Sequence, residues 1–236
     1  MIGIPIAVAL DMSSAEDAVR LARRIVPHVG AFKVGLELLS GPGPGVVSAV
    51  ADLGRPVFCD AKLHDIPNTV RRAAHNYARA GARWITVHAA GGLPMIEAAV
   101  DGAGSGAPDA GILCITVLTS LDSAQLAMVG QGDSVGRQVA RTARLARDAG
   151  AEGVVCSVRE LGDVAQVAPE LFKVTPGIRP PEASVDDQRR VATPQEALAR
   201  GADLLVIGRP ITAAADPVVA AAALAEMVVA SDDIGR

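Results

Sequence analysis

The chain of 236 residues has few aromatic side chains, with one Trp, one Tyr and three Phe. So few rings argue against a stacking platform for single-stranded nucleic acid. Half of the residues are hydrophobic, so Ala, Val, Leu and Ile must build the core. The formal net charge is only −4, which provides no electrostatic attraction to nucleic acid or to an anionic membrane. We therefore expect neither as a partner.

Cysteine is also scarce. Cys59, Cys114 and Cys156 lie in separate apolar runs, and an odd number so placed favours small buried side chains in a reducing compartment over a disulfide framework. The amino terminus lacks the basic region of a signal peptide. No apolar stretch approaches the roughly 20 residues that cross a bilayer. We expect a soluble, cytoplasmic protein.

Short β-rich runs recur along the whole chain and alternate with segments of helical periodicity. In the first such segment, Ser13 or Ser14 is the expected N-cap. The glycine-rich stretches 41–45 and 102–106 are predicted to be surface turns. The predicted strands are Ile6–Leu10, Ala31–Val34, Val57–Lys62, Trp84–His88, Ile112–Leu118, Gly153–Cys156, Phe172–Thr175 and Leu204–Ile207. Eight such units predict a single-domain (β/α)₈ barrel over residues 1–236, with an open doubly wound sheet as the alternative.

Polar side chains stand at the carboxyl ends of nearly all these strands, where barrels carry their active sites. Their convergence on one rim predicts an active site. His88 shares the inward parity of Thr86, and we interpret it as a hydrogen-bonded structural histidine rather than a catalytic one. The polar residues at these strand ends are Asp11, Lys33, Asp60, Lys62, Asp65, His88, Thr119, Ser120, Ser157, Arg179 and Arg209.

The most informative segment runs from residue 57 to residue 69. Because side chains alternate along a strand, Asp60 and Lys62 are expected to point the same way. With Lys33 and Asp65 they can form an array of alternating charge, in which each lysine stays protonated and each carboxylate stays ionised. Such a lysine suits proton delivery to a carbanion better than Schiff-base chemistry. A structural ion-pair network at the barrel mouth is the alternative.

No metal site is expected. The histidines show no ligand spacing and no His/Cys cluster suggests zinc, while Lys33 and Lys62 argue against Mg²⁺ among these carboxylates. Gly208 and Arg209 end the eighth predicted strand, where barrels often bind phosphate. Arg179 belongs to the loop 177–190, which is long enough to act as a lid. A solvated surface loop is the alternative for that segment.

Taken together, these segments resemble the orotidine 5′-phosphate decarboxylase family. The Asp-x-Lys-x-x-Asp core is shared with a wider superfamily, and its extension through Ile-Pro-Asn-Thr is more specific. The matching segments span nearly the whole chain in family order. They are Ala9-Leu10-Asp11, Phe32-Lys33-Val34-Gly35, Asp60 to Val70, Val87 to Gly92, Val117 to Ser120, Gly153 to Ser157, Val174 to Arg179, Asp187-Gln188 and Gly208 to Thr212.

The resemblance implies a homodimeric barrel that needs no metal and no organic cofactor and that makes UMP from orotidine 5′-phosphate. Lys62 would protonate C6 of the pyrimidine after CO₂ leaves. Asp60 would lie beside the departing carboxylate, and Lys33 would hold Asp60 and the ribose. The resemblance further implies residues that act in the neighbouring subunit's site, namely Asp65, Ile66 and Thr69.

The remaining implied roles concern binding. Asp11 would contact the ribose and Thr119 the pyrimidine amide, although the adjacent Ser120 competes for that role. Gln188 would bridge the base and the phosphate. The phosphate itself would be held by Arg179, Gly208 and Arg209.

Two other functions remain as alternatives. Keto-gulonate phosphate decarboxylases and hexulose phosphate synthases resemble the chain in the same core, but they use Mg²⁺ and carry an acidic residue at the strand-two position. Lys33 stands at that position here and argues against them. The second alternative is a catalytically silent nucleotide-binding barrel, which the complete set of expected charges disfavours.

Overall fold

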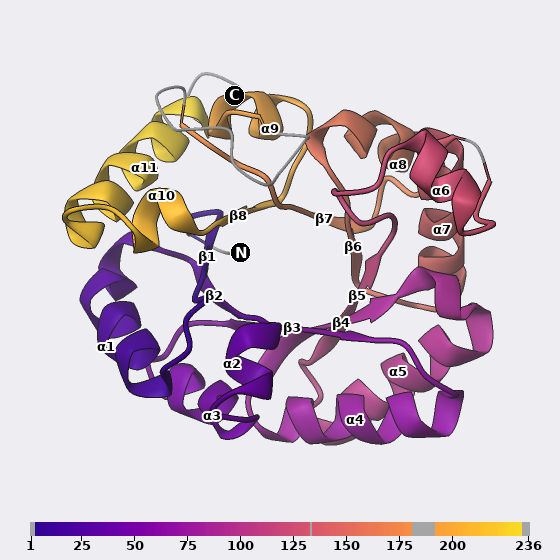
Figure 1. Cartoon of the computed structure of the whole chain (residues 1–236), viewed down its shortest axis with the longest axis horizontal. Coiled ribbons are helices and arrows are strands. Elements are labelled where there is room, and N and C mark those ends of the chain that lie inside the picture. The colour runs from indigo at the N-terminus through magenta and orange to yellow at the C-terminus, as the bar shows by residue number, and fades with distance from the viewer. Residues whose placement is uncertain (1–2, 133, 181–191, 233–236) are drawn as a thin grey trace.

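The computed structural model describes residues 3–132, 134–180 and 192–232. In it, eight parallel strands close into a barrel in sequence order, with β8 paired to β1. Figure 1 shows the strands at the centre and the helices around them. The strands are β1 (Ile6–Ala9), β2 (Ala31–Val34), β3 (Val57–Leu63), β4 (Ala82–His88), β5 (Gly111–Ile115), β6 (Gly153–Val155), β7 (Phe172–Thr175) and β8 (Leu204–Ile207). The predicted (β/α)₈ barrel is confirmed and the open sheet is wrong.

Helices form in the segments of helical periodicity that alternate with the strands. Three further short α-helices are present as well. Ser14 is the N-cap of α1, where its side chain accepts a hydrogen bond from the backbone N–H of Asp17. The helices that periodicity does not predict, α2, α6 and α10, have only 4 to 6 residues, too few for an apolar stripe. The α-helices are α1 (Ala15–Ile25), α2 (Leu36–Ser40), α3 (Gly45–Ala51), α4 (Pro67–Arg79), α5 (Leu93–Gly106), α6 (Ser123–Met128), α7 (Val135–Asp148), α8 (Leu161–Val167), α9 (Pro194–Ala199), α10 (Arg209–Thr212) and α11 (Pro217–Asp232).

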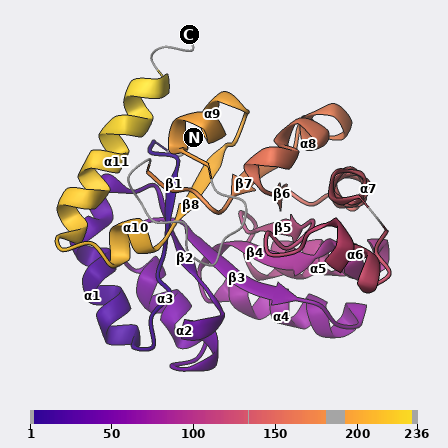
Figure 2. The ribbon, with the colours of Figure 1, turned by 45° about the horizontal axis from the view of Figure 1, so that its top comes forward.

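The glycine-rich segment 102–106 forms the last turns of α5, so the surface turn predicted there is wrong. The reason is the close packing of α5 on α4, which lie side by side in Figures 1 and 2. A Cβ on Gly102 would approach the carbonyl oxygen of Arg71 to 2.1 Å, and one on Gly106 would approach that of His75 to 2.5 Å. Here glycine permits close backbone approach. The turn predicted at 41–45 is present through residue 44, before α3 begins.

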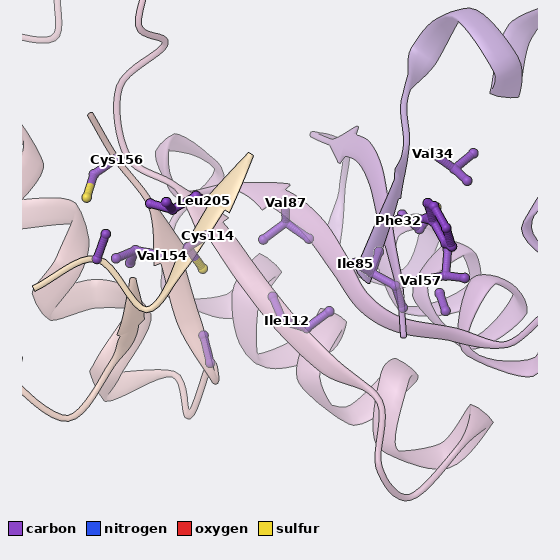
Figure 3. Close-up of a cluster of buried hydrophobic side chains, with 14 of the residues drawn as sticks. Phe32, Val34, Val57, Ile85, Val87, Ile112, Cys114, Val154, Cys156 and Leu205 are labelled. Carbon is purple, nitrogen blue, oxygen red and sulfur yellow. The ribbon is translucent and has the colours of Figure 1, made fainter. Parts of the chain in front are cut away.

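The larger hydrophobic core lies between the barrel and its ring of helices. Figure 3 shows part of this core, built mainly from Val, Ile, Leu and Cys side chains together with Phe32. Aliphatic residues thus supply most of the packing, as the composition predicts. Cys59, Cys114 and Cys156 are buried and free, which confirms their prediction as small buried side chains. Within the described chain, no helix is long and apolar enough to cross a membrane.

A smaller cluster fills the barrel itself. Its aromatic members are Phe58 and Trp84, with Phe172 packed against them, and the Trp84 and Phe172 rings stack with centroids 5.5 Å apart. The Trp84 indole N–H donates to Glu152, which also accepts two hydrogen bonds from Arg83. Three of the five aromatic rings of the chain thus lie in the barrel interior, and the polar site must lie above them.

Candidate active site

A cavity of about 350 Å³ opens at the carboxyl ends of the strands. Three of the charged residues that line it are Asp11, Lys33 and Asp60. Each follows, by two positions in the sequence, a residue of the smaller cluster that fills the barrel. The alternation that points those side chains inward therefore places charge at the barrel mouth. The predicted site residues that line this cavity are Asp11, Lys33, Asp60, Lys62, Thr119, Arg179, Gly208 and Arg209.

Four of these side chains form a continuous row of alternating charge. The Lys33 ammonium lies 2.8 Å from Asp11 Oδ1 and 3.6 Å from Asp60 Oδ2. The Lys62 ammonium lies 2.5 Å from the same Oδ2 of Asp60. Lys33 and Asp60 are largely buried, whereas 30% of the Lys62 side chain is exposed to the cavity mouth. Lys62 is therefore the ammonium of the row that an incoming ligand can best reach.

The surroundings of Asp60 favour its ionised form. Its burial alone would raise the pKa of the carboxyl, but the charges of Lys33 and Lys62 oppose that effect. Hydrogen bonds from Lys62 and Thr86 act in the same direction as the two lysines, and the net result is a pKa below the usual value. This direction agrees with the ionised carboxylate that the sequence predicts between two lysines.

An irregularity in β3 brings Asp60 and Lys62 together. Cys59 pairs with Ile85 and Leu63 pairs with Val87, so three residues of β3 lie opposite one residue of β4. Within this bulge, Lys62 has a φ of +51°, a left-handed conformation that is uncommon for a residue with a side chain. The two side chains do meet, but simple strand alternation does not explain why. Bulges of this kind commonly re-aim side chains next to active sites.

Three predicted site residues that follow β3 in the sequence lie outside the cavity. Asp65, Ile66 and Thr69 are exposed and do not line it, and the Asp65 carboxylate accepts a hydrogen bond from the backbone N–H of Ile66. Within one chain the fourth member of the charge row is therefore Asp11, and the predicted array with Asp65 is wrong for a single subunit. Their predicted action in a neighbouring subunit stays a prediction.

The loops after β5 and β7 place the remaining predicted residues. Thr119 lines the cavity, whereas its neighbour Ser120 lines an adjoining depression. Arg179 is 8% exposed and donates to the carbonyl oxygen of Ile178. Gln188 lies outside the described residues, as does most of the loop 177–190 that we expect to act as a lid.

His88 does not line the cavity. Its ring lies 5.5 Å from that of His64. Burial, together with the nearby His64 and Lys62, lowers the pKa of His88. A lowered pKa is compatible with either role, so the structural interpretation of this residue stays a prediction.

Two residues of the site, Gly35 and Thr86, have no role that the sequence predicts. A Cβ on Gly35 would lie 2.7 Å from the Lys33 ammonium and 2.8 Å from Asp11 Oδ1, so any other residue there would displace the ends of these two side chains. Thr86 is fully buried and joins Asp60 to the backbone of Lys62. The hydrogen-bond partners of Thr86 can be identified only when the pairing of β3 with β4 is known.

Across the described residues, no group of three or more His, Cys, Asp or Glu side chains could hold a metal ion. The Lys33 ammonium itself lies between the two carboxylates of the row. Fold and site together define a (β/α)₈-barrel enzyme with an alternating charge row at its catalytic end.

Comparison with known proteins gives the family. Residues 5–224 match the orotidine 5′-phosphate decarboxylase / HUMPS family, and the chain belongs to it. Orotidine 5′-phosphate decarboxylase of Anaeromyxobacter sp. (strain K) is 52% identical over 93% of this chain and 96% of its own length. The enzyme of that name from Thermobifida fusca is 52% identical, covering 94% of each chain. The crystal structure of Lactobacillus acidophilus orotidine 5′-phosphate decarboxylase superposes with a TM-score of 0.84 at 35% identity, covering 95% of this chain and 99% of its own.

Proposed function

We propose that this chain is an orotidine 5′-phosphate decarboxylase, a carboxy-lyase that forms UMP and CO₂ in pyrimidine biosynthesis. Two relatives that bear this name support the proposal, because they are 52% identical to this chain over almost the whole length of both proteins. The observation that carries it is the Lys62 ammonium, held 2.5 Å from Asp60 in the cavity of the barrel. An enzyme that protonates a carbanion at neutral pH needs a positioned general acid, and a fixed ammonium is one.

In the proposed reaction, the bond between C6 of the pyrimidine and its carboxylate breaks, and the electron pair stays on C6. The Lys62 ammonium stabilises this developing charge and then transfers a proton to C6, while CO₂ leaves. The Lys62 amine regains a proton from solvent after UMP departs. Asp60 lies beside the leaving carboxylate, and Lys33 orients Asp60 and contacts the ribose.

The other cavity residues bind parts of the substrate that do not react. We assign the phosphate to Arg179, Gly208 and Arg209, the ribose to Asp11, and the pyrimidine amide to Thr119. Gln188 bridges the base and the phosphate. Phosphate binding lies far from the breaking bond, yet its energy can drive closure of the loop and assemble the charged site.

The working unit in this proposal is a cytoplasmic homodimer of single-domain subunits with shared active sites. Asp65, Ile66 and Thr69 of each subunit complete the site of the other. Their exposure in the isolated chain supports this arrangement, because it leaves them accessible to a partner: the apolar side chain of Ile66, for example, is 67% exposed. Leu36, which follows β2, and Leu118, which follows β5, are also exposed.

The proposed chemistry uses neither a metal nor an organic cofactor. In the charge row, the Lys33 ammonium takes the place that a cation would take between Asp11 and Asp60. This position favours the proposal over a Mg²⁺-dependent sugar-phosphate decarboxylase or synthase of the same superfamily.

The direct test is an assay with orotidine 5′-phosphate, followed by loss of the orotate absorbance, with and without EDTA. We expect turnover that EDTA does not reduce and that added Mg²⁺ does not raise. Loss of activity in EDTA with recovery in Mg²⁺ would favour the metal-dependent relatives. Tight UMP binding without turnover would favour a non-catalytic nucleotide-binding barrel.

Replacing Gly35 by alanine tests the geometry of the charge row. The new Cβ would force Lys33 and Asp11 apart, and a displacement of this size is expected to lower kcat/KM by roughly 10- to 100-fold. The fold should persist, because the φ of −102° at Gly35 suits any residue. Gly45→Ala is the matched control, since its Cβ would meet nothing within 4 Å. Equal activity of the two variants would contradict the assigned role of the Asp11–Lys33 pair.

A further inference from the structure

Thr86 is a buried threonine on β4 that lies opposite the bulge of β3. It is 0% exposed and does not line the cavity. Its hydroxyl accepts a hydrogen bond from the backbone N–H of Lys62 at 2.8 Å and donates one to Asp60 Oδ1 at 3.0 Å. One side chain from the neighbouring strand thus links the two charged residues at the centre of the site.

The direction of both hydrogen bonds is fixed by their partners. A backbone N–H can only donate, so the Thr86 hydroxyl must accept from Lys62. The single hydroxyl proton is then available to Asp60, whose ionised carboxylate can only accept. This leaves Oδ2 of Asp60 facing the ammonium groups of Lys62 and Lys33.

The same hydroxyl also supports the unusual backbone of Lys62. A left-handed residue other than glycine persists only where its surroundings hold it in place. At Lys62 the hydrogen bond from its N–H to Thr86 is a direct constraint on that conformation. Releasing it would let the bulge relax and would move the root of the Lys62 side chain.

We propose that Thr86 is a positioning residue of the decarboxylation site: its hydroxyl sets the rotation of the Asp60 carboxylate and holds the Lys62 backbone so that the ammonium faces the reacting carbon. This inference rests on the proposed function. Thr86 acts through Asp60 and Lys62 and does not contact the substrate.

Thr116 provides a contrast within the same barrel. It is also buried, at 4% exposure, and follows directly after β5. Its hydroxyl donates to the backbone carbonyl of Val155 and not to a charged side chain. Removing that hydroxyl tests what the loss of a buried threonine hydrogen bond does to the barrel without touching the charge row.

The experiment compares three variants of the full-length protein: Thr86→Val, which removes the hydroxyl at nearly constant volume, Thr86→Ser, which keeps it, and Thr116→Val. We expect kcat for orotidine 5′-phosphate to fall roughly 10- to 100-fold in Thr86→Val, the effect of one hydrogen bond to a charged group. UMP affinity should change less than about threefold, because no ligand contact is lost. Thr86→Ser and Thr116→Val should keep kcat within about threefold of the wild type.

A crystal structure of Thr86→Val supplies a readout independent of activity, in which Asp60 is expected to rotate and Lys62 to leave the left-handed region. Unchanged kcat and unchanged positions of Asp60 and Lys62 would overturn the inference. So would equal losses of kcat and UMP affinity in both valine variants, which would mark a general loss of packing. Absence of turnover in the wild type would overturn the proposed function instead, and the crystal structure would still decide whether Thr86 holds the two residues.

Discussion

Replacing Lys62 by alanine is expected to lower kcat for orotidine 5′-phosphate by at least about 10⁴-fold, because one side chain supplies both proton transfer and electrostatic stabilisation. UMP binding should survive, since the phosphate and ribose contacts are assigned to other residues. The backbone should tolerate the change: alanine has the same Cβ penalty at a φ of +51° as the lysine that is already there. Stopped assays at high enzyme concentration and UMP titration by calorimetry measure the two effects.

The chain has only three lysines, Lys33, Lys62 and Lys173, so Lys173→Ala is a natural control. Lys173 lies near the start of β7 and pairs with Asp203 at 3.1 Å. It belongs to no part of the charge row, and its variant should keep kcat within about threefold of the wild type once folding is verified by circular dichroism. If Lys62→Ala lost UMP affinity along with turnover, Lys62 would be a structural residue and not a proton donor.

Mixing two inactive variants, Lys62→Ala and Asp65→Ala, is expected to restore activity. If each site takes Lys62 from one subunit and Asp65 from the other, a mixed dimer carries one site without either residue and one intact site. Random exchange at equal concentrations makes half of the dimers mixed, so about a quarter of wild-type activity should return. Each variant alone should stay near its own background.

The mixing experiment needs proof that subunits exchange, which differently tagged variants provide through co-purification. A matched mixture of Lys62→Ala with Asp60→Ala should give no recovery, because both residues belong to the same cavity. Mixed dimers that form without regaining activity would refute the shared site. They would leave Asp65, Ile66 and Thr69 as surface residues of their own subunit.

The barrel and its charged rim could be predicted because both follow from local periodicity. Runs such as Ala31–Val34 and Phe172–Thr175 coincide with β2 and β7. Strand alternation places Lys33 and Asp60 on the inner side of the barrel mouth without any knowledge of strand pairing. Helix N-caps are equally local, which is why the sequence limits the N-cap of α1 to Ser13 or Ser14, and the structure shows that it is Ser14.

The features that could not be predicted depend on pairing or on close approach between segments. The β3 bulge depends on the register against β4, where one residue, Thr86, lies opposite three. The lack of space for a Cβ at positions 35 and 102 arises from atoms of Asp11, Lys33 and Arg71 that lie elsewhere in the fold. Sequence patterns contain propensities, but not these distances.

The position of Asp65 shows how a short spacing can mislead. It follows Lys62 by only three residues, yet the chain leaves the barrel there. Ile66 is extended, with φ −60° and ψ 150°, and Pro67 begins α4, as expected for a residue that precedes proline. The turn carries the Asp65 side chain away from the cavity of its own barrel.

The left-handed backbone of Lys62 has a consequence for anyone who engineers this protein for heat resistance. A common stabilising substitution places glycine wherever a residue with a side chain has positive φ, and Lys62 is such a position. Glycine there would relieve roughly 1–2 kcal/mol of backbone strain. It would also delete the ammonium on which the proposed reaction depends. A selection scheme that scores melting temperature alone would favour this substitution, so activity must be screened alongside it.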